Sequence, residues 1–146
     1  MSEEKSSFND YFLGRQKADT TGYYTTPAIR KAYFIGAYAK AVINSSFHSK
    51  VSRENTTFKN WLSNQIINYQ NLDRIFEIAF RYEQKLKLNI RNQSEVRKLA
   101  HETPVDKAAG ISSAKISFAF VAGFDDYQKY SKAEQAKSAE KEKEND

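Results

Sequence analysis

Residues 28–47 form the most apolar segment of the chain and constrain its fold more than any other feature. Only three of these twenty residues are charged. The apolar side chains recur with the 3.6-residue period of an α-helix and cover nearly its whole circumference. Thr26 is placed to cap such a helix, and Pro27 suits its first turn, where a missing N–H costs nothing. Because a helix that is apolar all round is a buried one, the segment predicts the central helix of an all-α domain.

Amphipathic segments on its C-terminal side predict the helices that pack around this central helix. Each has apolar residues at helical spacing and a residue at its start that can cap it. We expect these helices at residues 58–69, 72–88, 95–101 and 112–130. Gly123 lies in the apolar stripe of the last one, so we expect this stripe to pack closely against residues 28–47. The pattern predicts a compact bundle of about four to six helices.

The remaining segments predict the ends of the domain and its connections. Residues 6–13 are rich in aromatic side chains and predict a short helix or an aromatic arm, docked on the body or on a neighbouring subunit. Residues 131–146 contain nothing hydrophobic larger than Ala, so they either extend the last helix into solvent or fray. We expect polar connections at residues 14–26, 44–57 and 103–110. The expected domains are an arm and linker at 1–24, a helical bundle at 25–130 and a charged tail at 131–146.

Three basic residues of the segment 72–88 share one face of the predicted helix. At about 100° per residue, Arg74, Arg81 and Lys85 lie opposite the apolar stripe that begins at Leu72. Successive spacings of seven and four residues spread them over about 16 Å of helix. Phosphates along a nucleic-acid strand recur on a comparable scale, so this ridge is able to follow a backbone. The alternative is a solvated face with local ion pairs, for which Glu77 is suitably placed.

The net charge of +5 is concentrated in the body of the chain. Residues 25–130 hold 16 basic and nine acidic residues, a net charge of +7, whereas residues 1–24 and 131–146 each carry a net charge of −1. A basic folded body between near-neutral ends favours a polyanionic partner, although ordinary solubility charge is the alternative.

No arrangement typical of a catalytic or metal site is present. His48 and His101 are far apart and lack carboxylates at ligand spacing. Asp125 and Asp126 are adjacent, so their side chains point in different directions on a helix. The chain has neither a glycine-rich phosphate loop nor a hydrolase motif. We therefore expect a protein that is not an enzyme and that uses no metal and no cofactor.

The composition also indicates the compartment. The chain has no cysteine, which favours the reducing cytoplasm. Residues 1–10 are too polar for a secretory signal, and no apolar run approaches the roughly 18 residues of a membrane span, so we expect no membrane partner. Two classes of function then remain. The first is a subunit that binds nucleic-acid backbone without reading bases. The second is a protein–protein adaptor in which the positive charge is incidental.

Three stretches of the chain resemble one known family. They are YFIGAYAKAVI at 33–43, the stretch 61–88 with LDRIFEIAF at its centre, and ISSAKISFAFVAGFDDYQKY at 111–130. In order and spacing they are similar to the helical C-terminal region of the large subunit of type I-B CRISPR interference complexes. The resemblance covers residues 28–130. The chain departs from it at 50–57, where it has KVSRENTT in place of an asparagine-containing stretch, so a small subunit of a type III complex is the alternative.

The resemblance implies a non-catalytic small subunit of the crRNA-guided complex Cascade, a role that this region fills when it is translated separately. Several copies would stack head to tail and bridge the large subunit and the backbone subunits. Their basic surface would stabilise the crRNA–DNA heteroduplex and the displaced non-target DNA strand, while a recruited nuclease cleaves. The family supplies no catalytic residue. From charge geometry alone, the candidate contact residues are Arg74, Arg81, Lys85, Lys87, Arg91, Arg97, Lys98, Lys50, Arg53 and Lys59.

Overall fold

The computed structural model describes residues 8–19, 26–47, 52–86, 93–102 and 112–144. These residues form six α-helices and one short 3₁₀ helix, and none of them lies in a strand. The elements are α1 (Phe8–Ala18), α2 (Pro27–Phe47), α3 (Ser52–Ser63), η2 (Tyr69–Asn71), α4 (Leu72–Leu86), α5 (Gln93–Glu102) and α6 (Ser113–Glu144). The prediction of a compact all-α bundle is confirmed.

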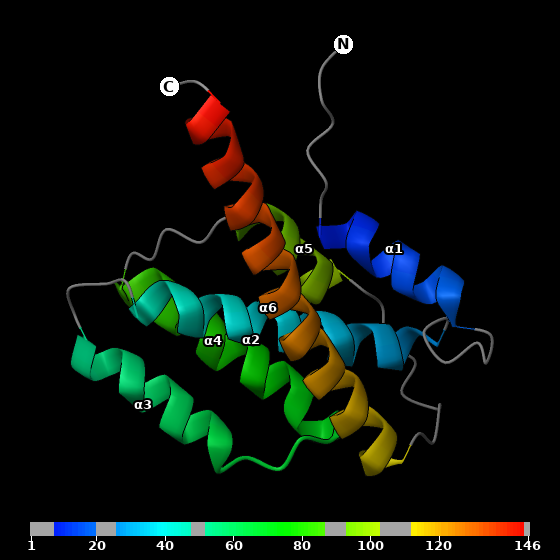
Figure 1. Ribbon diagram of the computed structural model, residues 1–146. Helices are drawn as coiled ribbons and strands as arrows, with labels where there is room; N and C mark the ends of the chain where they lie inside the picture. The colour runs from blue at the N-terminus through cyan, green and yellow to red at the C-terminus, as the bar shows by residue number, and fades with distance from the viewer. Residues whose placement is uncertain (1–7, 20–25, 48–51, 87–92, 103–111, 145–146) are drawn as a thin grey trace.

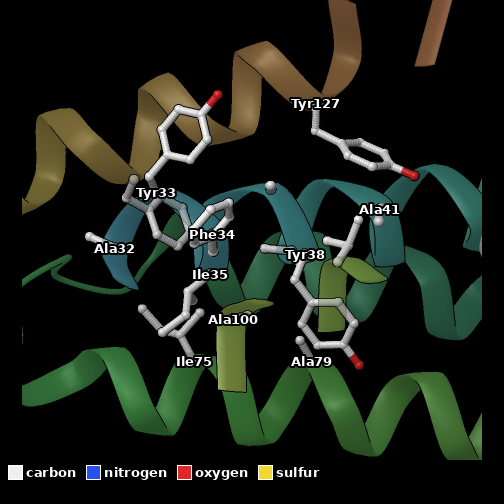
Figure 2. Close-up of a cluster of buried hydrophobic side chains, with 14 of the residues drawn as sticks. Ala32, Tyr33, Phe34, Ile35, Tyr38, Ala41, Ile75, Ala79, Ala100 and Tyr127 are labelled. Atoms are coloured by element: carbon white, nitrogen blue, oxygen red, sulfur yellow. The ribbon is translucent and has the colours of Figure 1, made fainter. Parts of the chain in front are cut away.

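Helix α2 runs through the middle of the molecule, with α6 crossing it on one side and α4 on the other (Figure 1). Every residue from 31 to 39 is buried, as the apolar circumference of the segment predicts. Figure 2 shows Ile35 and Tyr38 of α2 pointing toward Ile75 and Ala79 of α4, while Tyr127 of α6 lies on the opposite side. Burial of apolar surface on both sides of α2 is therefore the main force that holds the bundle together.

Two glycines allow α2 and α6 to cross in close contact. A β-carbon at Gly36 would lie 2.1 Å from the carbonyl oxygen of Phe120, and one at Gly123 would lie 1.8 Å from that of Tyr33. Since the two contacts are reciprocal, each helix places a glycine against the backbone of the other. The expected close packing of the last helix on residues 28–47 is confirmed.

Helix α1 docks on the body of its own chain, which is the first of the two expected arrangements for residues 6–13. Phe8 and Phe12 are buried, and their rings contact Tyr33 and Phe34 of α2. The carboxylate of Glu95 on α5 accepts hydrogen bonds from the amides of Phe8 and Asn9, at 2.8 and 3.3 Å. This carboxylate therefore satisfies two of the four amides that a helix start leaves unpaired.

The prediction of a linker starting at residue 14 is wrong, because α1 continues to Ala18. The additional turn carries Arg15, whose guanidinium pairs with Asp126 on α6. A polar residue of this kind gives no apolar signal in the sequence, and only the partner on α6 explains why the helix continues.

The connection predicted at residues 44–57 is also too long, because α2 continues to Phe47 and α3 begins at Ser52. The end of α2 is held by Asn44, whose side-chain amide donates to Gln128 on α6 at 2.9 Å. Helix α3 in turn ends at Ser63, six residues before the predicted end. There the side chains of Ser63 and Asn64 donate to the carbonyl of Asn60, at 2.8 and 3.0 Å, and stop the helix by taking the place of backbone donors.

The other helix bounds lie close to the predicted ones, apart from the C-terminal tail. Helix α6 starts after Ser112, whose hydroxyl accepts a hydrogen bond from the amide of Lys115 at 3.3 Å. It continues to Glu144, so the tail extends the last helix, which is one of the two expected outcomes. The loop predicted at 103–110 lies outside the described residues.

Candidate nucleic-acid interface

The three basic residues of the predicted ridge on α4 are exposed. Arg74, Arg81 and Lys85 lie on the solvent side of α4, and the apolar stripe on the other side of the helix packs into the core. The guanidinium of Arg81 forms an ion pair with Glu77 at 3.2 Å. The two side chains are 68% and 63% exposed, so water screens the pair and it holds Arg81 only weakly. We call Arg74, Arg81 and Lys85 the α4 ridge.

The other candidate residues are distributed over several elements. Lys59 on α3 and Lys98 on α5 are exposed, away from the α4 ridge in the sequence. Arg53 belongs to α3, but its side chain is outside the described part of the chain. Lys50, Lys87 and Arg91 also lie outside the described residues.

Arg97 has a structural partner that the sequence analysis did not identify. Its Nη1 donates to Glu83 of α4 at 3.1 Å, and the hydroxyl of Tyr38 on α2 donates to the same carboxylate. Glu83 is only 2% exposed, and the pair with Arg97 compensates the burial of its charge. The helical period indicates that Glu83 is buried, because at about 100° per residue it falls only about 20° from Leu72 in the buried stripe.

A second network of the same composition joins α1, α2 and α6. Asp126 is 1% exposed, accepts a hydrogen bond from the Tyr33 hydroxyl at 2.6 Å, and pairs with Arg15. Its neighbour Asp125 is exposed, so the two carboxylates point in different directions, as a helix requires. Asp126 therefore holds three helices together.

Lys31 links α2 to the C-terminal end of α5. Its ammonium donates to the carbonyls of Ala100 and His101, at 3.1 and 3.4 Å, and lies 3.9 Å from the exposed carboxylate of Asp73. A cation at this place satisfies carbonyls that the end of α5 leaves unpaired and complements the helix dipole. Burial lowers the pKa of Lys31, and the charge of Asp73 opposes that shift.

Lysines on two other helices act electrostatically on Lys40 of α2, and the sequence analysis identified Lys59 but neither Lys40 nor Lys132. The Nζ of Lys40 on α2 lies 4.8 Å from the centre of the Phe124 ring. Burial lowers the pKa of Lys40, the positive charges of Lys59 and Lys132 lower it further, and Asp125 opposes them. These lysines are far apart in the sequence, and only the packing of α2, α3 and α6 brings their charges within range of each other.

No protein-family model, no curated protein and no solved structure matches the chain. Among the described residues, no group of His, Asp and Glu side chains is arranged to hold a metal ion. In the same part of the chain, none of the helices combines the length and the apolar character that crossing a membrane requires.

Proposed function

We propose that this protein is a non-catalytic subunit that binds the sugar–phosphate backbone of nucleic acids. The observation that carries this proposal is the α4 ridge, three exposed cations on one face of a helix whose other face is buried. A rigid helix presents them over about 16 Å, so neighbouring phosphates can be contacted without reordering the protein. Contacts with phosphates fix the position of the protein on the nucleic acid and contribute affinity, but they do not read the base sequence.

The charge balance of the chain supports the same proposal. The body carries a net charge of +7, and two of its lysines, Lys40 and Lys59, lie close enough to repel each other, as do Lys40 and Lys132. Lys59 and Lys132 each repel the charge of Lys40, and a bound anion would relieve this repulsion.

The more specific proposal follows from the resemblance of residues 28–130. The protein would serve as the small subunit of a crRNA-guided CRISPR interference complex in the cytoplasm. Its cations would hold the crRNA–DNA heteroduplex and the displaced strand, and copies of the chain would contact the large and backbone subunits. A small subunit of a type III complex is distinguished by its companions, because the subunits that co-purify with the tagged protein differ between the two types.

The test reverses the charge of the α4 ridge with Arg74→Glu, Arg81→Glu and Lys85→Glu in one chain. Circular dichroism should show an unchanged helical fold, since the side chains are exposed. Binding to a duplex should weaken, and the slope of log affinity against log salt should decrease by about 2–3 in magnitude. In the assembled complex, R-loop formation should weaken as well.

A matched control makes the same change in net charge elsewhere, with Lys17→Glu, Lys115→Glu and Lys129→Glu at exposed positions of α1 and α6. If the two triple variants bind the duplex with the same affinity, the α4 ridge is not the contact surface. If the unmodified chain binds no nucleic acid and co-purifies with no guide RNA, the protein is an adaptor and the proposal is wrong.

A further inference from the structure

Four side chains of α4 and α5 form a row in which two phenyl rings lie side by side, with Arg97 at one end and His101 at the other. Phe80 is 37% exposed and stacks on Phe76 with ring centres 6.3 Å apart and planes only 4° from parallel. The guanidinium carbon of Arg97 lies 5.7 Å from the centre of the Phe80 ring. At the other end the exposed imidazole of His101 lies 5.7 Å from the Phe76 ring. We call these four residues the aromatic row.

Contacts with buried side chains hold the aromatic row in place. Arg97 is anchored by the buried carboxylate of Glu83, which fixes its guanidinium beside Phe80. Phe76 packs on the ring of Tyr38 at 5.2 Å, which ties the row to the central helix. A surface made rigid in this way loses little side-chain entropy when a flat ligand binds to it.

Two further exposed cations lie on the same two helices. Arg81 follows Phe80 on α4, and Lys98 follows Arg97 on α5, and both side chains are exposed. An aromatic ring with a guanidinium beside it, as Phe80 has in Arg97, matches the two parts of a nucleotide, since the base stacks on a ring and the phosphate pairs with a cation. In a duplex each base is stacked on its neighbours and exposes little of its faces, so a surface of this kind selects unpaired nucleotides.

We infer that the aromatic row is a stacking site for unpaired bases of single-stranded nucleic acid, with Phe80 as its main platform. This inference rests on the proposed function and names the part of the nucleic acid that the α4–α5 surface holds. Arg97 and Lys98 contact the backbone beside the stacked base, while the α4 ridge binds phosphates whether the strands are paired or not. Occupation of the row by an apolar segment of a partner protein is the competing possibility, and the test below separates the two.

The test compares a single-stranded oligonucleotide carrying 2-aminopurine with a duplex of the same sequence, using the full chain. Binding should change the fluorescence of 2-aminopurine in the single strand, because the analogue reports stacking. Phe80→Leu keeps an apolar side chain and removes the ring. It should weaken binding of the single strand about 5- to 100-fold and abolish the fluorescence change, while leaving duplex binding within about twofold of the unmodified chain.

Phe118→Leu on α6 is the matched control, because it makes the same substitution at a side chain that is 65% exposed. It should leave both affinities unchanged. Equal loss of single-strand and duplex binding in Phe80→Leu would overturn the inference, because it would indicate a general packing role. Loss of a partner subunit from the Phe80→Leu complex with unchanged oligonucleotide binding would overturn it in favour of a protein contact.

The outcomes also separate this inference from the proposed function. If Phe80→Leu changes nothing while reversal of the α4 ridge abolishes binding, only the stacking site is wrong. If the unmodified chain binds neither oligonucleotide, both proposals are wrong.

Discussion

Gly123 on α6 lies directly against the backbone carbonyl group of Tyr33 on α2. A β-carbon added to Gly123 would lie 1.8 Å from the carbonyl oxygen. The nearest atoms all belong to the backbone of the central helix, so no side-chain rotation can make room for a methyl group. The separation of the two longest helices in the bundle is therefore set by a missing side chain.

The first prediction concerns this crossing. Gly123→Ala should destabilise the protein by about 3 kcal/mol or more, because α6 must move away from α2 and the packing of the core is lost along the interface. Urea unfolding followed by circular dichroism measures the change. Gly36→Ala should act in the same direction, since its β-carbon would lie 2.1 Å from the carbonyl oxygen of Phe120.

Gly14→Ala is the matched control for these substitutions, because a β-carbon at that position would meet nothing within 4 Å. As an exposed position inside α1, it should gain about 0.5–1 kcal/mol from the better helix propensity of alanine. A destabilised Gly14→Ala together with a neutral Gly123→Ala would contradict the crossing described here.

The second prediction concerns Asp126, the buried carboxylate shared by Arg15 and Tyr33. Asp126→Asn keeps the shape of the side chain and removes its charge, so Arg15 loses its ionic partner. The free energy of unfolding should fall by about 3 kcal/mol. The neighbouring change Asp125→Asn, at an exposed position, should stay within about 0.5 kcal/mol, and an equal effect of the two would refute the assignment.

The third prediction is a pH dependence that depends on Tyr38. Burial raises the pKa of Tyr38 above its ordinary value of 10.0, as do the hydrogen bond to Glu83 and the negative charge of Glu83, while Arg97 opposes them. Above pH 10.0 the unfolded chain therefore releases the Tyr38 proton while the folded chain keeps it. Because the folded state then binds more protons, its stability falls as the pH rises.

Tyr38→Phe removes this dependence. At neutral pH the variant should be less stable by about 1–2 kcal/mol, since Glu83 loses a buried hydrogen bond. Above pH 10.0 the difference from the unmodified chain should shrink, by up to about 1.4 kcal/mol per pH unit. Guanidinium unfolding at a series of alkaline pH values tests this, and a difference that stays constant across the series would count against it.

The fourth prediction concerns Glu77, the partner of Arg81 in the α4 ridge. Glu77→Gln removes a negative charge beside the ridge and releases Arg81 from an ion pair that is mostly in water. Affinity for single-stranded and duplex DNA should therefore rise about twofold, with a stability change below about 0.5 kcal/mol. Asp10→Asn on α1 makes the same change in net charge away from the ridge, and an equal rise for both would attribute the effect to total charge.

Helix α4 has one feature that its sequence predicts and one that its sequence does not explain. Its period placed Arg74, Arg81 and Lys85 on the solvent side, where the structure has them. The same period assigns Glu83 to the buried stripe, but a sequence alone provides no reason to bury a carboxylate. That reason is Arg97, fourteen residues further along the chain, together with Tyr38 on the central helix.

Helix ends were harder to predict than helix faces. Residues 14–18 belong to α1 although none of them has a large apolar side chain, and Arg15 in this turn pairs with Asp126 at a separation of 111 residues. Conversely, the apolar character of Ile66 predicts a position in the helix expected at 58–69, yet Ile66 is 70% exposed beyond the end of α3. Local polar side chains and distant partners decide such ends, and neither produces a periodic signal.

The helical pattern of the amino-acid sequence is enough to predict the all-α class, the buried central helix and the outward direction of the α4 ridge. These properties follow from the helical period, which relates each side chain to its neighbours three and four residues away. Packing of the helices creates the two Arg–carboxylate–Tyr networks, the proximity of other lysines to Lys40 and the aromatic row of α4 and α5. Each of these joins residues of different helices, whose proximity depends on packing and is not encoded in any local spacing.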